Sequence, residues 1–125
     1  MLDALYREQI LEHWREPHHF GELADATHNA FLSNPLCGDE IGMQLCIAND
    51  HIQDIRFMGR GCAISMAATS MLTDVIHGKT LAETQQLTEQ DIVALLGTTP
   101  NPSRMKCALL GLETLQRAVA KDGDT

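Results

Sequence analysis

The chain has 125 residues, and we expect residues 1–125 to form a single domain whose core is mostly aliphatic, because only 4% of the residues are aromatic. At 44% hydrophobic and 21% charged, it has the composition of an ordinary globular protein. The formal net charge of −8, without any cluster of lysine and arginine, argues against partners that are nucleic acids or membrane surfaces, since both need cationic side chains.

The first predicted element is a helix near the N-terminus. Apolar and aromatic residues recur there at helical spacing, Asp3 is suited to cap the start, and Pro17 ends the pattern. The residues on this one face are Leu2, Leu5, Tyr6, Ile10, His13 and Trp14.

Three strands are predicted next. Phe31 and Leu32 belong to the first strand, and a period of two over residues 41–48 indicates the second. Asn49-Asp50 is a plausible tight turn, after which residues 52–58 form the third strand. Sequential strands joined by short turns predict an antiparallel meander.

The rest of the chain is predicted to be helical. One helix runs from Cys62 to His77, and Gly78 follows it. Two shorter helices and a last, longer one follow, and each begins at a capping residue. The expected caps are Thr80 with Glu83, Thr88 before a helix over 92–96 that Gly97 ends, and Ser103 before a helix whose apolar stripe runs from Met105 to Val119. We therefore predict an α+β fold, a three-stranded antiparallel sheet with helices packed on one face.

Three short motifs stand out because each is built around a cysteine. They are Asn34-Pro35-Leu36-Cys37-Gly38-Asp39, Gly59-Arg60-Gly61-Cys62-Ala63-Ile64-Ser65 and Arg104-Met105-Lys106-Cys107-Ala108. No apolar run approaches the roughly 20 residues of a transmembrane helix, and no signal peptide is evident, so we expect a cytoplasmic protein. Thiols stay reduced in that compartment, which favours metal or catalytic roles over disulfides.

The positions of these cysteines suit a metal centre that the fold assembles. Cys37 is expected in a turn before Gly38, Cys62 at the start of a helix, and Cys107 in the first turn or so of the last helix. Helix N-termini favour the thiolate, which binds metals and attacks sulfur. Asp39 is close enough in sequence to complete a tetrahedral set, and a carboxylate would hold a thiophilic centre less firmly than a fourth thiolate.

Simpler interpretations remain open for several of these residues. Asp39 also suits a turn residue that bonds its own backbone, and Lys106 is either a surface charge or a group that tunes the Cys107 thiolate. Cys46, in mid-strand, is interpreted as a small buried hydrophobe. The histidines show no metal spacing, and His18-His19 is interpreted as a solvated turn.

Together the motifs resemble the U-type iron–sulfur cluster assembly proteins, the family of IscU, SufU and the N-terminal module of NifU. The resemblance covers nearly the whole chain, from Leu5-Tyr6-Arg7 through the three cysteine motifs in the family's order. It implies that Cys37, Asp39, Cys62 and Cys107 hold the metal or cluster, with Cys37 as the sulfur acceptor. It also implies that a pyridoxal-phosphate cysteine desulfurase supplies sulfur, and that a transient 2Fe–2S cluster is built with iron and passed to apo-proteins.

Three functions fit this resemblance. The first is a scaffold that carries a cluster without turning over a small molecule, so that enzymatic activity is an open question. The second is a zinc-dependent sulfurtransferase, with Zn²⁺ in the same site and persulfide accepted on Cys37. The third is a plain structural zinc module. Arg104-Met105-Lys106-Cys107-Ala108 is similar to the SufU pattern, whereas the 44 residues between Cys62 and Cys107 resemble the IscU arrangement, which lacks the SufU insertion.

Overall fold

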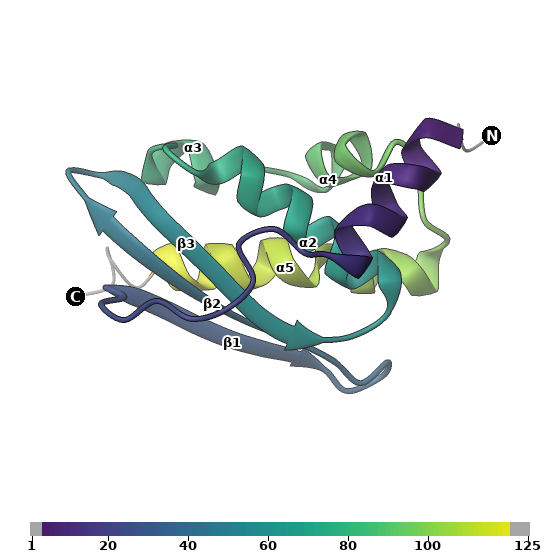
Figure 1. Cartoon of the computed structure of the whole chain (residues 1–125), viewed down its shortest axis with the longest axis horizontal. Helices are drawn as coiled ribbons and strands as arrows, with labels where there is room; N and C mark the ends of the chain where they lie inside the picture. Colours follow the sequence, from purple (N-terminus) through teal and green to yellow (C-terminus); the bar gives the residue numbers. More distant parts are fainter. Residues whose placement is uncertain (1–3, 121–125) are drawn as a thin grey trace.

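The computed structural model describes residues 4–120, so the predicted cap Asp3 lies outside the described residues, as does Leu2. The elements in chain order are α1 (Ala4–Arg15), β1 (His28–Asn34), β2 (Asp39–Ala48), β3 (His51–Arg60), α2 (Ala63–Ile76), α3 (Leu81–Gln85), α4 (Glu89–Leu96) and α5 (Pro102–Ala120). Figure 1 shows the strands side by side with the long helix α5 running along them. Among the helices of residues 4–120, none combines the length and apolar character that crossing a bilayer requires.

The sheet is the predicted antiparallel meander, with strand order β1-β2-β3. Asn34 pairs with Asp39 where β1 turns into β2, so the first cysteine motif forms the connection between these strands. Asn49 and Asp50, with φ of 53° and 64°, form the turn between β2 and β3 as predicted. The predicted α+β class is thus confirmed.

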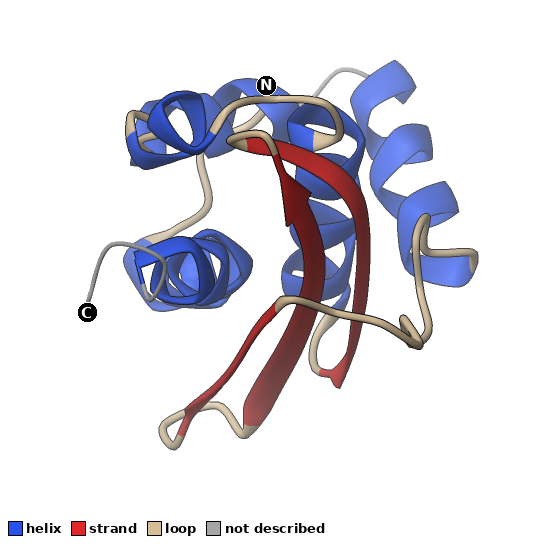
Figure 2. Cartoon of the chain, turned by 90° about the vertical axis from the view of Figure 1, so that its left-hand side faces the viewer, coloured by secondary structure: helices blue, strands red, loops and turns tan. Residues whose placement is uncertain are grey.

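Helices α2 and α5 contact the sheet, whereas α1 packs on α2 (Figure 2). Ile41, Met43 and Leu45 of β2 are at most 1% exposed, because their alternate positions face the helices. On the other face Phe31 is 61% exposed opposite Gly42. The predicted apolar face of α1 is only partly buried. Ile10 is 7% exposed, whereas Trp14, which was predicted on the same face, is 45% exposed.

The start of the last helix corrects one prediction. Helix α5 begins at Pro102, and the residue before it is Asn101, whose Oδ1 accepts a hydrogen bond of 2.9 Å from the Arg104 N–H. Proline suits the first helical position, because no N–H is needed there. Ser103 is therefore inside the first turn and does not cap the helix, which moves Cys107 into the second turn. By contrast, Thr80 with Glu83 forms the predicted capping box, and Gly97 ends α4 with φ of 72°.

Candidate metal centre

The three cysteine motifs, far apart in sequence, meet in the structure around Asp39. The Cys107 Sγ lies 3.3 Å from the Cys37 Sγ, and the Cys62 Sγ lies 3.6 Å from the Asp39 Oδ2. One ligand atom each from Cys37, Asp39 and Cys107 lies within 4.8 Å of the others. The fold therefore gathers Cys37, Asp39 and Cys107 into one group that a single ion could contact, and Cys62 adjoins this group through its contact with Asp39.

Cys37 lies on the exposed turn between β1 and β2. The Asn34 carbonyl accepts hydrogen bonds from the N–H groups of Cys37 (3.3 Å) and Gly38 (2.8 Å), which closes the turn. Gly38 has φ of 75°, a conformation that glycine adopts without strain. The neighbouring Leu36 is 82% exposed and the Cys37 side chain is exposed as well, so another protein could reach this thiol.

Asp39 begins β2 on the side of the sheet that faces the helices, where it is only 3% exposed. Its Oδ1 accepts a hydrogen bond of 3.2 Å from the backbone N–H of Cys62, across 23 residues of sequence. The alternative that Asp39 bonds its own turn is therefore wrong. Gly61 makes room for this carboxylate, since a Cβ at that position would lie 2.7 Å from the Asp39 Cγ.

Cys62 occupies the N-cap position of α2, as predicted, with extended backbone angles (φ −69°, ψ 166°). Its side chain makes no capping hydrogen bond to the helix and contacts Asp39 instead. The positive end of the helix dipole therefore lies beside both the Cys62 thiol and the Asp39 carboxylate.

Cys107 differs from the prediction. Burial raises the pKa of the Cys107 thiol, and so do its hydrogen bonds with Cys37 and Asp39. The thiol is 3% exposed and lies in the second turn of α5, beyond the strongest effect of the helix terminus. The expectation that a helix start promotes its thiolate is thus wrong for the metal-free chain. A bound metal ion would displace the proton that this thiol keeps.

The fourth cysteine takes no part in this cluster. Cys46 is half-buried, and its Sγ lies 3.3 Å from the Asp25 carbonyl oxygen. All four cysteines are free thiols, and the 3.3 Å between the Cys37 and Cys107 sulfurs exceeds the roughly 2.05 Å of a disulfide bond. Lys106, beside Cys107 in sequence, is exposed.

The histidines are organised in a way that the sequence did not reveal. His18 and His19 form the predicted turn, but both side chains also have partners in α2: His18 Nδ1 lies 2.6 Å from the Asp74 Oδ2, and His19 Nδ1 lies 3.0 Å from the Thr73 Oγ1. Burial, and then the charge of His18, lowers the pKa of His13. These groups escaped detection because Asp74 is 56 residues away from His18 and meets it only in the fold.

Comparisons with known proteins give the chain's relatives. The family described as NifU-like N terminal domain matches residues 5–122. The zinc-dependent sulfurtransferase SufU of Bacillus subtilis (strain 168) is 35% identical over 138 residues, covering 97% of this chain and 93% of that protein. The iron-sulfur cluster assembly scaffold protein IscU of Aquifex aeolicus (strain VF5) is 39% identical over 116 residues, covering 91% and 73%.

A solved structure agrees with these relatives. The crystal structure of a putative iron-sulfur cluster assembly scaffold protein for the SUF system, from Fervidobacterium islandicum AW-1, has a TM-score of 0.78 at 29% identity, covering 90% of this chain and 94% of that one. The alignment with the Bacillus protein spans 138 positions, which is more than the 125 residues of this chain. The Bacillus protein therefore contains residues that have no counterpart in this chain. From its matched domain and these relatives, the chain belongs to the NifU-like N-terminal domain family, which includes IscU and SufU.

Proposed function

We propose that this protein is an iron–sulfur cluster assembly scaffold. It accepts sulfur from a pyridoxal-phosphate cysteine desulfurase, assembles a 2Fe–2S cluster with iron, and transfers the cluster to apo-proteins. The observation that carries the proposal is the convergence of three thiols on one buried carboxylate, with one thiol on an exposed turn. Relatives named as cluster assembly scaffolds, at up to 39% identity, support it.

The proposed ligands of the cluster are Cys37, Asp39, Cys62 and Cys107. Thiolates suit iron–sulfur centres, whereas the carboxylate of Asp39 is a harder donor and a weaker partner for a thiophilic metal. A set with one weak ligand suits a centre that must be released after assembly. Asp39 is held by the Cys62 N–H, so its oxygen stays at the centre while the cluster is built.

Cys37 is the proposed sulfur acceptor, because its thiol is exposed. Its thiolate attacks the outer sulfur of the desulfurase persulfide, which forms a new S–S bond on Cys37 and releases the desulfurase thiolate. An external electron donor then supplies two electrons that cleave this S–S bond, which releases sulfide and restores the Cys37 thiolate. The sulfide combines with iron at the neighbouring ligands. Cys107, 3.3 Å away, is the nearest sulfur ligand to receive the metal.

The test is anaerobic reconstitution of metal-stripped protein with ferrous iron, cysteine, a reductant and a cysteine desulfurase. Visible absorption should report a cluster, and an apo-ferredoxin should then acquire it. Cys107→Ser should abolish cluster formation, whereas Cys46→Ser, outside the group, should retain it. Asp39→Ala should form a cluster that transfers more slowly than that of the wild type. A cluster that forms equally well in Cys107→Ser would refute the assignment of the ligands.

A second candidate is a zinc-dependent sulfurtransferase that accepts persulfide on Cys37. It is favoured by the exposure of this thiol and by the relative that carries this name. The donor set fits zinc, which binds three thiolates and a carboxylate in a tetrahedral arrangement. In that case the zinc-loaded protein should stimulate desulfurase turnover and collect persulfide on Cys37, and no cluster should form. A structural zinc module would instead lose stability on Asp39→Ala and would not affect the desulfurase.

A further inference from the structure

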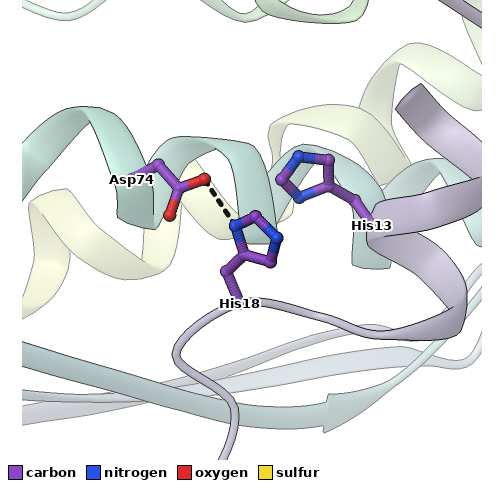
Figure 3. A group of neighbouring side chains, drawn as sticks. All are labelled: His13, His18 and Asp74. Atoms are coloured by element: carbon purple, nitrogen blue, oxygen red, sulfur yellow. Dashed lines mark hydrogen bonds and ion pairs between the residues drawn. The ribbon is translucent and has the colours of Figure 1, made fainter.

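His13, His18 and Asp74 form a second cluster of metal-ligating side chains, apart from the cysteine centre (Figure 3). One ligand atom from each lies within 4.8 Å of the other two. Asp74 is in the last turn of α2, whereas Cys62 precedes the first turn. The twelve residue steps from Cys62 to Asp74 correspond to about 18 Å of helix rise, so one ion cannot serve both groups.

Three different segments build this cluster. His13 comes from α1, His18 from the segment that follows it, and Asp74 from α2, and Figure 3 shows the His18 ring between the other two side chains. The His18 Nδ1 lies 2.6 Å from the Asp74 Oδ2, and the centroids of the two imidazole rings are 4.2 Å apart. Each of the three residues therefore already has a ligand atom within reach of the other two.

A buried serine holds two of these segments in place. The Ser70 Oγ is 2.6 Å from the His13 Nδ1 and accepts a hydrogen bond of 2.7 Å from the His18 backbone N–H. Ser70 itself is fully buried in α2. Such outer hydrogen bonds orient ligand side chains at metal sites, and they reduce the entropy that is lost when an ion binds.

The cluster is accessible from solvent and lies on an acidic surface. The side chains of His18 and Asp74 are 42% and 41% exposed, and a surface hollow of about 320 Å³ is lined in part by His13, Asp74 and Glu12. A second hollow shares Glu12 and is lined by Glu8, Glu16 and the cationic Arg15. Glu12 and Asp74 therefore place two carboxylates in the hollow beside the histidines, where they attract cations.

We propose that His13, His18 and Asp74 bind one divalent first-row transition-metal ion, such as Fe²⁺ or Zn²⁺, which replaces the direct contact between His18 and Asp74. Two imidazoles and one carboxylate are a known donor set for zinc and for ferrous iron, with further positions open to water. With bonds of about 2.05 Å, tetrahedral ligand atoms lie roughly 3.4 Å apart, so donors within 4.8 Å need only small rotations. This site does not depend on the function proposed for the cysteine centre.

The test is equilibrium dialysis of the full chain against Zn²⁺, with bound zinc counted by mass spectrometry. The wild type should bind one ion more than His18→Ala or Asp74→Asn, and the affinity of that ion should fall at least about 100-fold in either variant, since even outer-shell changes cost 10–100-fold. The matched control is His51→Ala. His51 is exposed, and its side chain makes a hydrogen bond with the Asn49 carbonyl oxygen in the turn between β2 and β3. It should bind as many ions as the wild type.

Two further measurements separate the sites and guard against misfolding. The variant Cys37→Ser/Cys107→Ser should keep the additional ion, and the ring nitrogens of His13 and His18 should shift in ¹⁵N spectra when Zn²⁺ is added. If His18→Ala is unfolded by circular dichroism, the isosteric Asp74→Asn decides the question. Equal zinc binding by the wild type and Asp74→Asn would overturn the site. So would loss of the additional ion in Cys37→Ser/Cys107→Ser, if the ¹⁵N resonances of His13 and His18 also stay unchanged when Zn²⁺ is added.

Discussion

Gly61→Ala tests whether the space beside Asp39 controls the cysteine centre. An alanine Cβ at position 61 would lie 2.7 Å from the Asp39 Cγ and 2.8 Å from its Oδ1. Carbon atoms in contact lie about 3.5 Å apart or more, so the carboxylate would have to move by roughly 0.8 Å. That movement would break the 3.2 Å hydrogen bond from the Cys62 N–H.

The expected cost follows from these contacts. Overpacking costs about 1–3 kcal/mol, and a hydrogen bond to a charged group contributes about 1.5–3 kcal/mol, with the long Cys62–Asp39 bond at the lower end. Replacing glycine by alanine also stabilises the fold by about 0.4–1 kcal/mol, because it lowers the conformational entropy of the unfolded chain. We expect a net loss of about 2–3 kcal/mol of unfolding free energy. Zinc should bind at least tenfold more weakly, since metal ligands tolerate only about 0.2 Å of displacement.

The assay is urea unfolding of the metal-free chain, together with zinc affinity measured against a competing chelator. A double-mutant cycle supplies the control. The Asp39→Ala background removes the two shortest contacts and keeps the 3.1 Å contact with the residue 39 Cβ, so Gly61→Ala should cost less than about 1 kcal/mol there. Equal costs in both backgrounds, or unchanged zinc affinity in Gly61→Ala, would refute this reasoning.

Two other substitutions test the sheet. A Cβ at Gly59 would lie 2.2 Å from the Glu40 carbonyl oxygen, so Gly59→Ala should cost about 3 kcal/mol in urea unfolding, whereas Gly42→Ala, with 3.4 Å to a flexible side chain, should cost less than about 1 kcal/mol. Although burial raises the pKa of Asp54, hydrogen bonds from the adjacent N–H and from Arg56 outweigh it and hold the pKa below the ordinary 3.8. This stabilisation is present above pH 3.8 and is lost as the pH falls through the lower folded value, so Asp54→Asn should lose less stability than the wild type between pH 5 and pH 2. Parallel acid profiles would contradict this.

Most helix and turn boundaries could be predicted from short local patterns in the sequence. Turn and cap signals at Asn49-Asp50, Thr80 and Gly97 act over a few residues, so they were correctly identified from sequence alone. The start of α5 was misplaced because Asn101 and Ser103 both suit a cap, and Pro102 between them is accommodated only as the first helical residue.

The centre required information that no local pattern contains. The motif around Cys107 identified a ligand type, yet the burial that raises the pKa of this thiol arises from the packing of α5 against the sheet. The contact between His18 and Asp74 likewise joins a loop to the far end of α2. Both features depend on tertiary packing, which spacing along the chain does not encode.

Approach to the cysteine centre is one-sided. Asp39 and Cys107 are each 3% exposed and belong to elements packed in the core, whereas Cys37 lies on a short turn beside the solvent-exposed Leu36. A visiting protein could therefore reach the outer thiol without displacing Asp39 or Cys107 from the core. Access to the outer thiol and the stability of the fold thus depend on different residues, so a substitution at Leu36 should alter what can approach the thiol at little cost to the core.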